Sequence, residues 1–184
     1  MCILTGAEIL TAIKNEDIKI EGLKEGSIGT ESIDLHLGSE IKILECNSFN
    51  KIDVKQPSVY YELPMNNNSF ILLPNQLYLA HTIEKVGSKL YHPQLHDKSS
   101  CMRLGISTHG NSGFGDCGFF GQWTLEIQVV KPTILYVGMA ICQISFETLQ
   151  GKKSYYGDRE SSKYMNQTGA TESKINENFE EKER

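Results

Sequence analysis

The sequence of 184 residues lacks a long apolar run, an excess of positive charge and a leader-like N-terminus. A bilayer-spanning helix needs about 20 consecutive apolar residues, and no such stretch occurs. The first residues, MCILTGAEIL, do not combine a basic region with an apolar core, as a signal peptide does. The formal net charge is -5, whereas a nucleic-acid-binding surface requires clustered positive charge. We therefore expect a cytoplasmic protein that binds neither membranes nor nucleic acid.

Paired-cysteine motifs are also missing, which bears on both disulfides and metals. The cysteines are odd in number and form no CxxC pair, so we predict reduced thiols at Cys2, Cys46, Cys101, Cys117 and Cys142. His92 and His96 are the nearest thing to a ligand pair, but Pro93 between them disfavours a helix presenting both to one metal. His81 and His109 lie farther away and complete no second pair. We therefore expect no zinc site.

Linkers rich in Pro or Ser are absent as well, and the chain length suits one domain. We expect this domain at residues 1–170. From about Gly151 the composition becomes polar, and the charged ending KINENFEEKER indicates that residues 171–184 form a mobile tail.

The residues that are present predict one helix and many short strands. TGAEILTAIKNEDI is typical of a helix, with Thr5 as N-cap and Glu8 three residues later. SIDLHLGSEIKIL predicts two strands around a Gly-Ser turn, and FILLPNQLYLAHTIEKV predicts two more that are separated at Pro74–Asn75. TILYVGMAICQISFETL predicts a last pair bent at Gly138. This pattern indicates a mainly β fold, a barrel or a sandwich, with a short N-terminal helix.

An acid interrupts one of the strongest predicted strands. The stretch GFFGQWTLEI contains strand formers such as Trp123 and Leu125, but also Glu126. One interpretation places Glu126 on a solvated face, because Thr124 and Gln128 share its parity along the strand. The other makes it a functional carboxylate, because the preceding segment has the composition of a binding site.

Charged and hydroxyl side chains gather in that preceding segment. DKSSCMRLG places Lys98, Ser99, Ser100 and Arg103 within six residues, and STHGNSGFGDCGFFG adds five glycines. Positive charge, short hydroxyl donors and unhindered backbone N–H groups together suit a phosphate site. A surface turn with solvated charges is the alternative.

These segments resemble a known family. HDKSSCMRLG followed by HGNSGFGDCGFFGQWTLE is similar to the core of the dCTP deaminases, which are trimeric β proteins related to the dUTPases. SIDLHLG, LPNQLYLAHTIEKV and YGDRESSKYMNQTG resemble further motifs of that family in the same order. The resemblance runs from the N-terminal helix to about residue 170. It implies a dUTPase-like distorted β-barrel of jelly-roll-like form, a homotrimer, and a C-terminal flap at about residues 151–170.

The resemblance also implies roles for individual residues. Glu126 would be the general base that activates water for attack at C4 of the pyrimidine, with no metal-bound hydroxide. Ser99 and Arg103 would lie near the base and the attacking water, where Arg103 would help to hold that water and offset developing charge. The residues expected to bind the substrate dCTP are Lys98, Ser99, Ser100, Arg103, Ser112, Asp116, Phe119, Thr124, Glu126, Tyr156, Lys163 and Gln167.

Within this set the resemblance assigns different parts of the nucleotide. Asp116 would hold the deoxyribose 3′-hydroxyl, and Phe119 would lie under the sugar. Magnesium would arrive with the triphosphate, held mainly by phosphate oxygens and water. The resemblance further implies inhibition by dTTP. The residues assigned to the triphosphate, directly or through closure of the flap, are Lys98, Ser99, Ser100, Tyr156, Lys163 and Gln167.

The glycine-rich loop departs from the family pattern. Ser112 stands where the family has Ala, Asn111 where it has Thr, Gly115 where it has Ile, and Cys117 where it has Pro or Ala. Gly115 and Ser112 are expected to loosen or polarise the loop and to make room for a second water.

Three functions remain open. The first and preferred one is a dCTP deaminase that gives dUTP and ammonia in pyrimidine deoxynucleotide metabolism. The second is a bifunctional enzyme that also cleaves dUTP to dUMP and pyrophosphate, which GFFGQWTLEI and Phe114 favour. The third is a non-catalytic, dNTP-binding regulatory trimer, which only the substituted loop favours. Catalysis is preferred because Glu126, Arg103 and Ser99 occur together at the family spacing.

Overall fold

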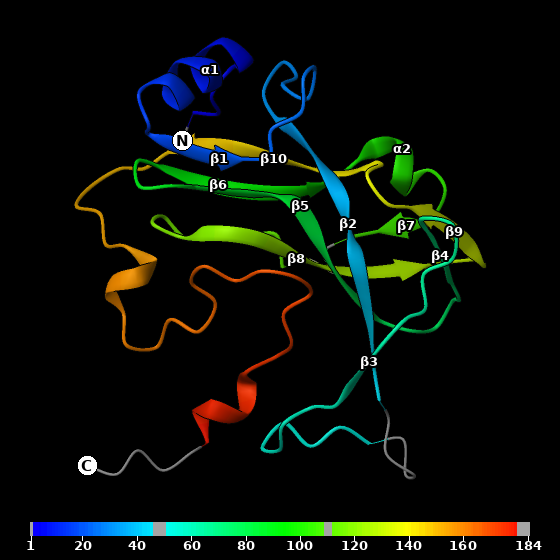
Figure 1. Cartoon of the computed structure of the whole chain (residues 1–184). Coiled ribbons are helices and arrows are strands. Elements are labelled where there is room, and N and C mark those ends of the chain that lie inside the picture. The colour runs from blue at the N-terminus through cyan, green and yellow to red at the C-terminus, as the bar shows by residue number, and fades with distance from the viewer. Residues whose placement is uncertain (1, 46–50, 109–111, 180–184) are drawn as a thin grey trace.

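The computed structural model describes residues 2–45, 51–108 and 112–179, and it is mainly β with a short N-terminal helix, as the sequence predicts (Figure 1). The elements in chain order are α1 (Gly6–Lys14), β1 (Ile18–Glu21), β2 (Ile33–Leu44), β3 (Tyr60–Glu62), β4 (Ser69–Leu72), β5 (Tyr78–Ser88), β6 (Tyr91–Asp97), α2 (Ser99–Met102), β7 (Ile106–Ser107), β8 (Phe120–Val129), β9 (Thr133–Tyr136), β10 (Ala140–Thr148), and the 3-10 helices η1 (Tyr156–Asp158) and η2 (Ile175–Asn178).

Helix α1 begins where the sequence predicts. The Thr5 hydroxyl oxygen accepts a hydrogen bond from the Glu8 backbone N–H, with 3.4 Å between the two heavy atoms. Ile9 and Ala12 are buried, whereas Leu10 is exposed. The helix packs its buried side against β1.

Antiparallel pairing joins the strands into two sheets. The larger sheet has the order β6-β10-β2-β5-β8-β7, with β1 paired to β5 and β3 paired to β2. The smaller sheet is the pair β4–β9. Both sheets contribute to one hydrophobic core, in which Leu35, Phe70, Leu125 and Ile144 are at most 1% exposed. Strand β8 lies between β5 and β7, which fixes it from both edges.

Most predicted breaks between strands are confirmed. β4 and β5 lie on either side of Pro74–Asn75, and β9 and β10 on either side of Gly138. Asn75 and Gly138 have φ angles of 65° and 80°, a left-handed conformation that Asn and Gly adopt most readily.

The predicted turn at Gly38–Ser39 is wrong. β2 continues through these residues as one strand of 12 residues, although its pairing with β5 is irregular between Leu37 and Ile41. Glycine is needed at this position because a Cβ atom on Gly38 would lie 2.1 Å from Cε1 of the His81 ring. The small residue therefore accommodates a neighbouring side chain and does not reverse the chain.

A buried polar network connects β2, β5 and β8. Glu84 is fully buried, and its carboxylate accepts the His36 backbone N–H at 2.9 Å and contacts His36 Nδ1 at 2.5 Å. The Thr82 hydroxyl donates to the Glu84 carbonyl at 2.7 Å and accepts the Trp123 N–H at 2.9 Å. These bonds replace the regular ladder where the β5–β8 register shifts after His81. They hold β8 at the point where it enters the candidate site.

Residues 171–179 pack against the rest of the chain, so the packed structure extends beyond the boundary expected at residue 170. Lys42 Nζ lies 3.2 Å from Glu172 Oε1, and the Lys174 N–H donates to the Tyr164 hydroxyl at 3.0 Å. The last residues of the predicted tail, 180–184, lie outside the described residues.

Two sequence expectations concern the described chain as a whole. Residues 2–45, 51–108 and 112–179 contain no helix that is long and apolar enough to cross a membrane. The cysteines in these ranges are free thiols, namely Cys2, Cys101, Cys117 and Cys142, while Cys46 lies outside them.

Candidate active site

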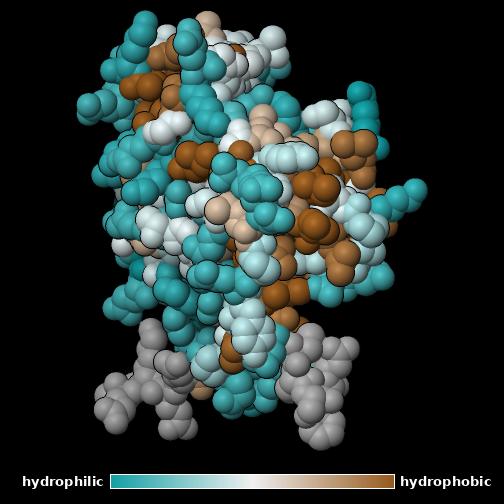
Figure 2. Space-filling model, turned by 45° about the vertical axis from the view of Figure 1, so that its right-hand side comes forward, coloured by the Kyte–Doolittle hydropathy of each residue, from teal (hydrophilic) through white to brown (hydrophobic). Residues whose placement is uncertain are grey.

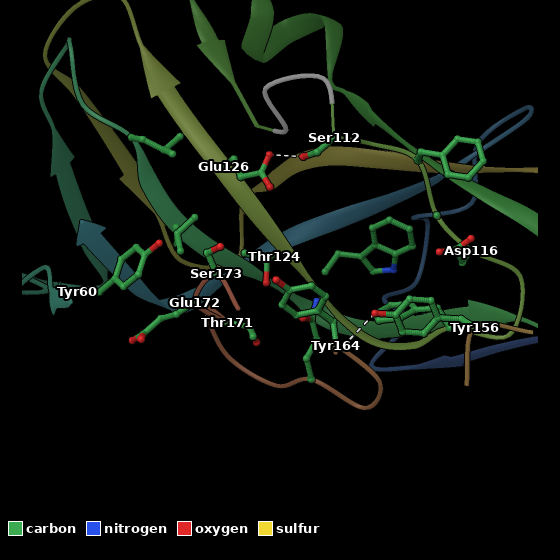
Figure 3. A pocket seen from close by; sticks show the side chains of 17 residues that line it. Tyr60, Ser112, Asp116, Thr124, Glu126, Tyr156, Tyr164, Thr171, Glu172 and Ser173 are labelled. Atoms are coloured by element: carbon green, nitrogen blue, oxygen red, sulfur yellow. Dashed lines mark hydrogen bonds between the residues drawn. The ribbon is translucent and has the colours of Figure 1, made fainter. Parts of the chain in front are cut away.

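A cavity of about 450 Å³ lies on the face of β8 that points away from the core (Figure 3). Its walls come from β8, the loop before β8, the start of β5, Tyr60 of β3 and the C-terminal residues 156–173. Figure 3 shows Asp116 and Tyr156 at one end and Tyr60 with Glu172 at the other. The sequence-predicted residues that line it are Ser112, Asp116, Phe119, Thr124, Glu126, Tyr156 and Gln167.

The alternation of β8 places Glu126 in this cavity. Trp123, Leu125 and Ile127 are buried in the core, so Thr124 and Glu126 lie on the opposite face. Thr124 and Glu126 thus lie on the same face of β8, as their spacing predicts. Near Glu126 this face is covered by the walls of the cavity.

Two contacts fix the surroundings of Glu126. The Ser112 hydroxyl donates a hydrogen bond to the Glu126 carboxylate, and the Glu126 backbone N–H donates to the Thr108 carbonyl at 2.9 Å. Thr108 is in turn held by Asp97, whose Oδ1 accepts its backbone N–H at 2.6 Å and its hydroxyl at 2.7 Å. Asp97 therefore positions the chain beside Glu126, a role that no sequence motif indicates.

Aromatic rings form the cavity wall near Asp116. The Phe119 ring meets the rings of Trp123 and Tyr156 nearly edge-on, with centroids 5.4 Å and 5.9 Å apart. Trp123 Nε1 donates to the Val86 carbonyl at 3.2 Å, which fixes the indole. A rigid apolar surface beside a carboxylate can support a sugar ring and accept hydrogen bonds from its hydroxyl groups.

Gly115 lines the cavity, but it does not make room for water on the side where its Cβ atom would lie. A Cβ atom on Gly115 would lie 2.4 Å from Trp123 Cη2 and 2.5 Å from the Pro93 carbonyl oxygen. The Gly115 N–H already donates to that carbonyl at 3.0 Å. The neighbouring Phe114 ring packs on His92, with 4.3 Å between ring centroids. The Trp123 indole ring therefore fills the space that a larger side chain at position 115 would occupy.

The C-terminal strap, residues 164–173, runs along β8 and forms one wall of the cavity (Figure 1). The Gln122 N–H donates to the Gln167 carbonyl at 3.0 Å, and Gln167 Nε2 donates to the Gln122 carbonyl at 2.8 Å. The Gly169 N–H donates to Gln122 Oε1 at 2.6 Å. One glutamine of β8 thus holds the middle of the strap.

Lys42 holds the far end of the strap. Its Nζ lies 3.2 Å from Oε1 of both Glu172 and Glu40. Burial alone would lower the pKa of Lys42, but its hydrogen bonds with the two carboxylates outweigh burial and raise it. Burial raises the pKa of Tyr60, which lines the cavity near Glu172. The sequence does not indicate Tyr60 or Glu172, because no motif marks them.

The phosphate-binding residues predicted in DKSSCMRLG do not reach this cavity. Lys98 Nζ forms an ion pair with Asp34 Oδ2 at 2.6 Å. Ser99, Ser100 and Arg103 are exposed on α2 and just after it. A single chain therefore holds the two halves of the predicted site apart.

The flap residues divide in a similar way. Lys163 does not line the cavity, because its Nζ donates to the Lys174 carbonyl at 2.7 Å and to Asn178 Oδ1 at 2.6 Å. The Tyr156 hydroxyl accepts the backbone N–H groups of Lys163 and Tyr164, each at 3.1 Å. Tyr156 thus shapes the flap and also lines the cavity.

Potential metal ligands do not cluster in the described part of the chain, where no three His, Cys, Asp or Glu residues could hold one ion. The ring nitrogens of four histidines contact neighbouring oxygens instead: His36, His81, His92 and His96. His109 and Asn111 lie outside the described residues.

Comparison with known proteins identifies the family. A family model described as dCTP deaminase-like matches residues 3–149. Proteins named dCTP deaminase, dUMP-forming, from Leptospira biflexa and Cytophaga hutchinsonii are 39% and 37% identical, over 98% and 97% of this chain and 99% of theirs. A protein of the same name from Hathewaya histolytica is 36% identical over 97% of this chain and 99% of its own. The chain belongs to the dCTP deaminase-like family, so the predictions of this family and of an enzyme are confirmed.

A solved structure supports the fold. The crystal structure of 2′-deoxycytidine 5′-triphosphate deaminase from Agrobacterium tumefaciens matches with a TM-score of 0.60 at 20% sequence identity. The match covers 79% of this chain and 47% of that chain. This similarity of fold confirms the predicted dUTPase-like β architecture.

Proposed function

We propose that this protein is a dCTP deaminase that converts dCTP to dUMP, with Glu126 as the catalytic base. One observation carries the proposal: Glu126 lies in a cavity with a second acid, Asp116, and an aromatic wall, in a chain whose full-length relatives are named dUMP-forming dCTP deaminases. The Glu126 carboxylate is suited to act as the general base. The end of the cavity at Asp116 is suited to bind the deoxyribose.

Deamination replaces the amine at C4 with an oxygen atom from water. Glu126 takes a proton from the water as its oxygen attacks C4 and delivers that proton to N3. It then takes the proton of the new C4 hydroxyl and delivers it to the amine, which leaves as ammonia when the C4–N bond breaks. The balance is dCTP and water giving dUTP and ammonia. Ser112 donates to one carboxylate oxygen and so orients the group, which leaves the other oxygen for the water.

A second hydrolysis would cleave dUTP to dUMP and pyrophosphate. Water attacks the α-phosphorus, and the bond to the bridging oxygen of pyrophosphate breaks. The names of the relatives favour dUMP as the final product. The sequence alone favours release of dUTP instead. Because Trp123 fills the space at Gly115, the second water would have to lie on the side of the loop that faces Asp116.

We also propose that the site is completed by a second copy of the chain in a homotrimer. Exposed apolar side chains occur on β4, β9 and beside α2, namely Ile71, Ile134, Tyr136, Leu104 and Val130. Figure 2 shows apolar surface gathered on the side of the molecule where β4 and β9 lie. Association buries such surface. It would also carry Ser99 and Arg103 of one copy to the cavity of the next, where they hold the water and the triphosphate.

Magnesium and dTTP belong to the same proposal. Asp116, Glu126 and Glu172 line the cavity, but the described residues include no group of three ligands for one ion. A magnesium ion that arrives with the triphosphate, bound through phosphate oxygens and water, fits this arrangement. Addition of dTTP to a dCTP assay tests the expected inhibition.

A product assay with paired variants tests the function. Wild-type protein with dCTP and magnesium should release ammonia, dUMP and pyrophosphate. Glu126→Gln keeps the side-chain shape but cannot accept a proton, so the rate should fall by at least ~10²-fold. Glu31→Gln, an exposed change outside the cavity walls, should leave the rate unchanged.

Other outcomes would replace parts of the proposal. Near-normal deamination by Glu126→Gln would remove it as the base. Accumulation of dUTP in a single turnover would make dUTP the product. Binding of dCTP without any turnover would favour the non-catalytic regulatory trimer.

A further inference from the structure

The hydroxyl of Thr124 is a buried polar group without a partner. Among the described residues, Thr124 Oγ1 is the one buried side-chain nitrogen or oxygen atom that has no hydrogen-bond partner. Thr124 lines the cavity two residues before Glu126, on the same face of β8. Figure 3 shows its hydroxyl in the middle of the cavity, between the Glu126 wall and Tyr164.

An unsatisfied hydroxyl at this position points to a ligand. Burying a hydroxyl without a hydrogen bond costs free energy, so folded proteins rarely leave one in that state. Other polar groups of this part of the sheet are satisfied, because the Thr82 hydroxyl accepts the Trp123 N–H and the Thr108 carbonyl accepts the Glu126 N–H. The ligand that fills the cavity can satisfy Thr124.

The order of groups along β8 indicates which atom of the ligand Thr124 meets. Asp116 and Phe119 come before the strand and lie at the sugar end, and Glu126 lies farther along. Thr124 is between them in sequence, about 6.6 Å from Glu126 along the strand. The edge of a cytosine nucleotide presents the sugar, then the O2 carbonyl, then N3 and the C4 amine. Aligning the C4 end with Glu126 therefore places O2 beside Thr124.

We propose that the Thr124 hydroxyl donates a hydrogen bond to the O2 carbonyl of the pyrimidine and positions the base for attack at C4. The inference rests on the proposed function, because it takes dCTP as the ligand. O2 accepts but cannot donate, which matches the free donor of the hydroxyl. Cytosine and uracil share this carbonyl, so the same bond holds the base before and after deamination. Thr124 is thus a positioning residue that selects pyrimidines with an oxygen at C2.

Binding to catalytically inactive protein tests the contact without interference from turnover. In a Glu126→Gln background, Thr124→Val replaces the hydroxyl with a methyl group of similar shape, and the dissociation constant for dCTP should rise about 10-fold. Thr124→Ser restores a hydroxyl and should recover most of the affinity. Thr148→Val, an exposed change outside the cavity walls, controls for the substitution itself. If the valine variant does not fold, Thr124→Ala replaces it.

An analogue identifies the atom. 2-Thio-dCTP carries sulfur, a weaker acceptor, in place of O2, so it should bind the Glu126→Gln protein less tightly than dCTP does. In Thr124→Val the two ligands should bind alike, because the donor that distinguishes them is gone. A merely structural role for Thr124 would weaken both ligands equally and keep the difference between them.

Three results would overturn the inference. They are unchanged dCTP affinity in Thr124→Val, no recovery in Thr124→Ser, or a 2-thio effect that persists in Thr124→Val. Failure of the proposed function looks different, since wild-type protein would then not deaminate dCTP, whatever the effect of Thr124→Val on binding.

Discussion

The backbone of Gly115 lies so close to Trp123 and the Pro93 carbonyl that no side chain fits there. We expect Gly115→Ala to lower the free energy of unfolding by about 1–3 kcal/mol, the usual cost of overpacking. The added methyl group would also displace the indole from the aromatic wall next to Phe119. Urea denaturation followed by tryptophan fluorescence measures both effects, because Trp123 is the sole tryptophan in the sequence.

Gly157→Ala is the matched control for this prediction. A Cβ atom there would lie 3.4 Å from Met165 Cε, an ordinary contact distance, and the change should leave stability within about 0.5 kcal/mol. Equal urea midpoints for wild type and both variants would contradict the tight packing of Gly115.

Among the elements, the C-terminal strap depends on few contacts. Gln122 holds its middle, and the ion pair between Lys42 and Glu172 holds its far end. Glu172→Gln removes the negative charge but keeps the side-chain length, which should weaken the strap by about 0.2–1 kcal/mol. Hydrogen exchange of the Gly169 amide, which donates to Gln122 Oε1, should become about 1.4- to 5-fold faster.

The contribution of Lys42 to strap closure also has a pH dependence of defined sign. The folded-state pKa of Lys42 is raised above its ordinary value of 10.5, so its charge persists to higher pH in the closed strap than in the open one. The ion pair is fully present below pH 10.5 and is lost as the pH rises through the raised pKa.

Glu177→Gln, exposed and near the end of the described chain, is the control for Glu172→Gln, and its Gly169 amide should exchange like that of the wild type. Equal acceleration in both variants would contradict the role of Glu172.

Elements with strong local patterns could be predicted from the sequence, and those formed by distant contacts could not. Thr5 with Glu8 marked the helix, and Pro74–Asn75 and Gly138 marked real breaks, because each acts within a few residues. Gly38 resembled a turn residue, although its small size serves His81, which is distant in sequence. The polar composition of residues 171–173 gave no sign of their contacts, because their partners lie on β2 and β3.

The same distinction applies to the site. Strand alternation placed Thr124 and Glu126 on one face, and the family motif indicated Asp116 and Phe119, all of which line one cavity. Sequence spacing could not show that Ser99 and Arg103 lie outside it, because spacing along the chain does not determine where α2 lies relative to β8.

At the scale of the whole molecule, the separation of α2 from the cavity can be tested by mixing inactive variants. Arg103→Ala keeps Glu126 in its own cavity, and Glu126→Gln keeps Arg103 on its own α2. If each site takes Glu126 from one copy and Arg103 from the next, mixed trimers contain some complete sites. Random exchange at equal amounts should restore about a quarter of the wild-type rate, because a complete site needs an intact Glu126 from one copy and an intact Arg103 from the next, each with a chance of about one half.

Mixing Arg103→Ala with Ser99→Ala should restore almost nothing, since both changes affect the same half of the site. Light scattering before and after mixing should give the mass of a trimer in every sample. Activity that stays at the level of the separate variants, with exchange confirmed by differently tagged chains, would show that α2 serves the cavity of its own chain.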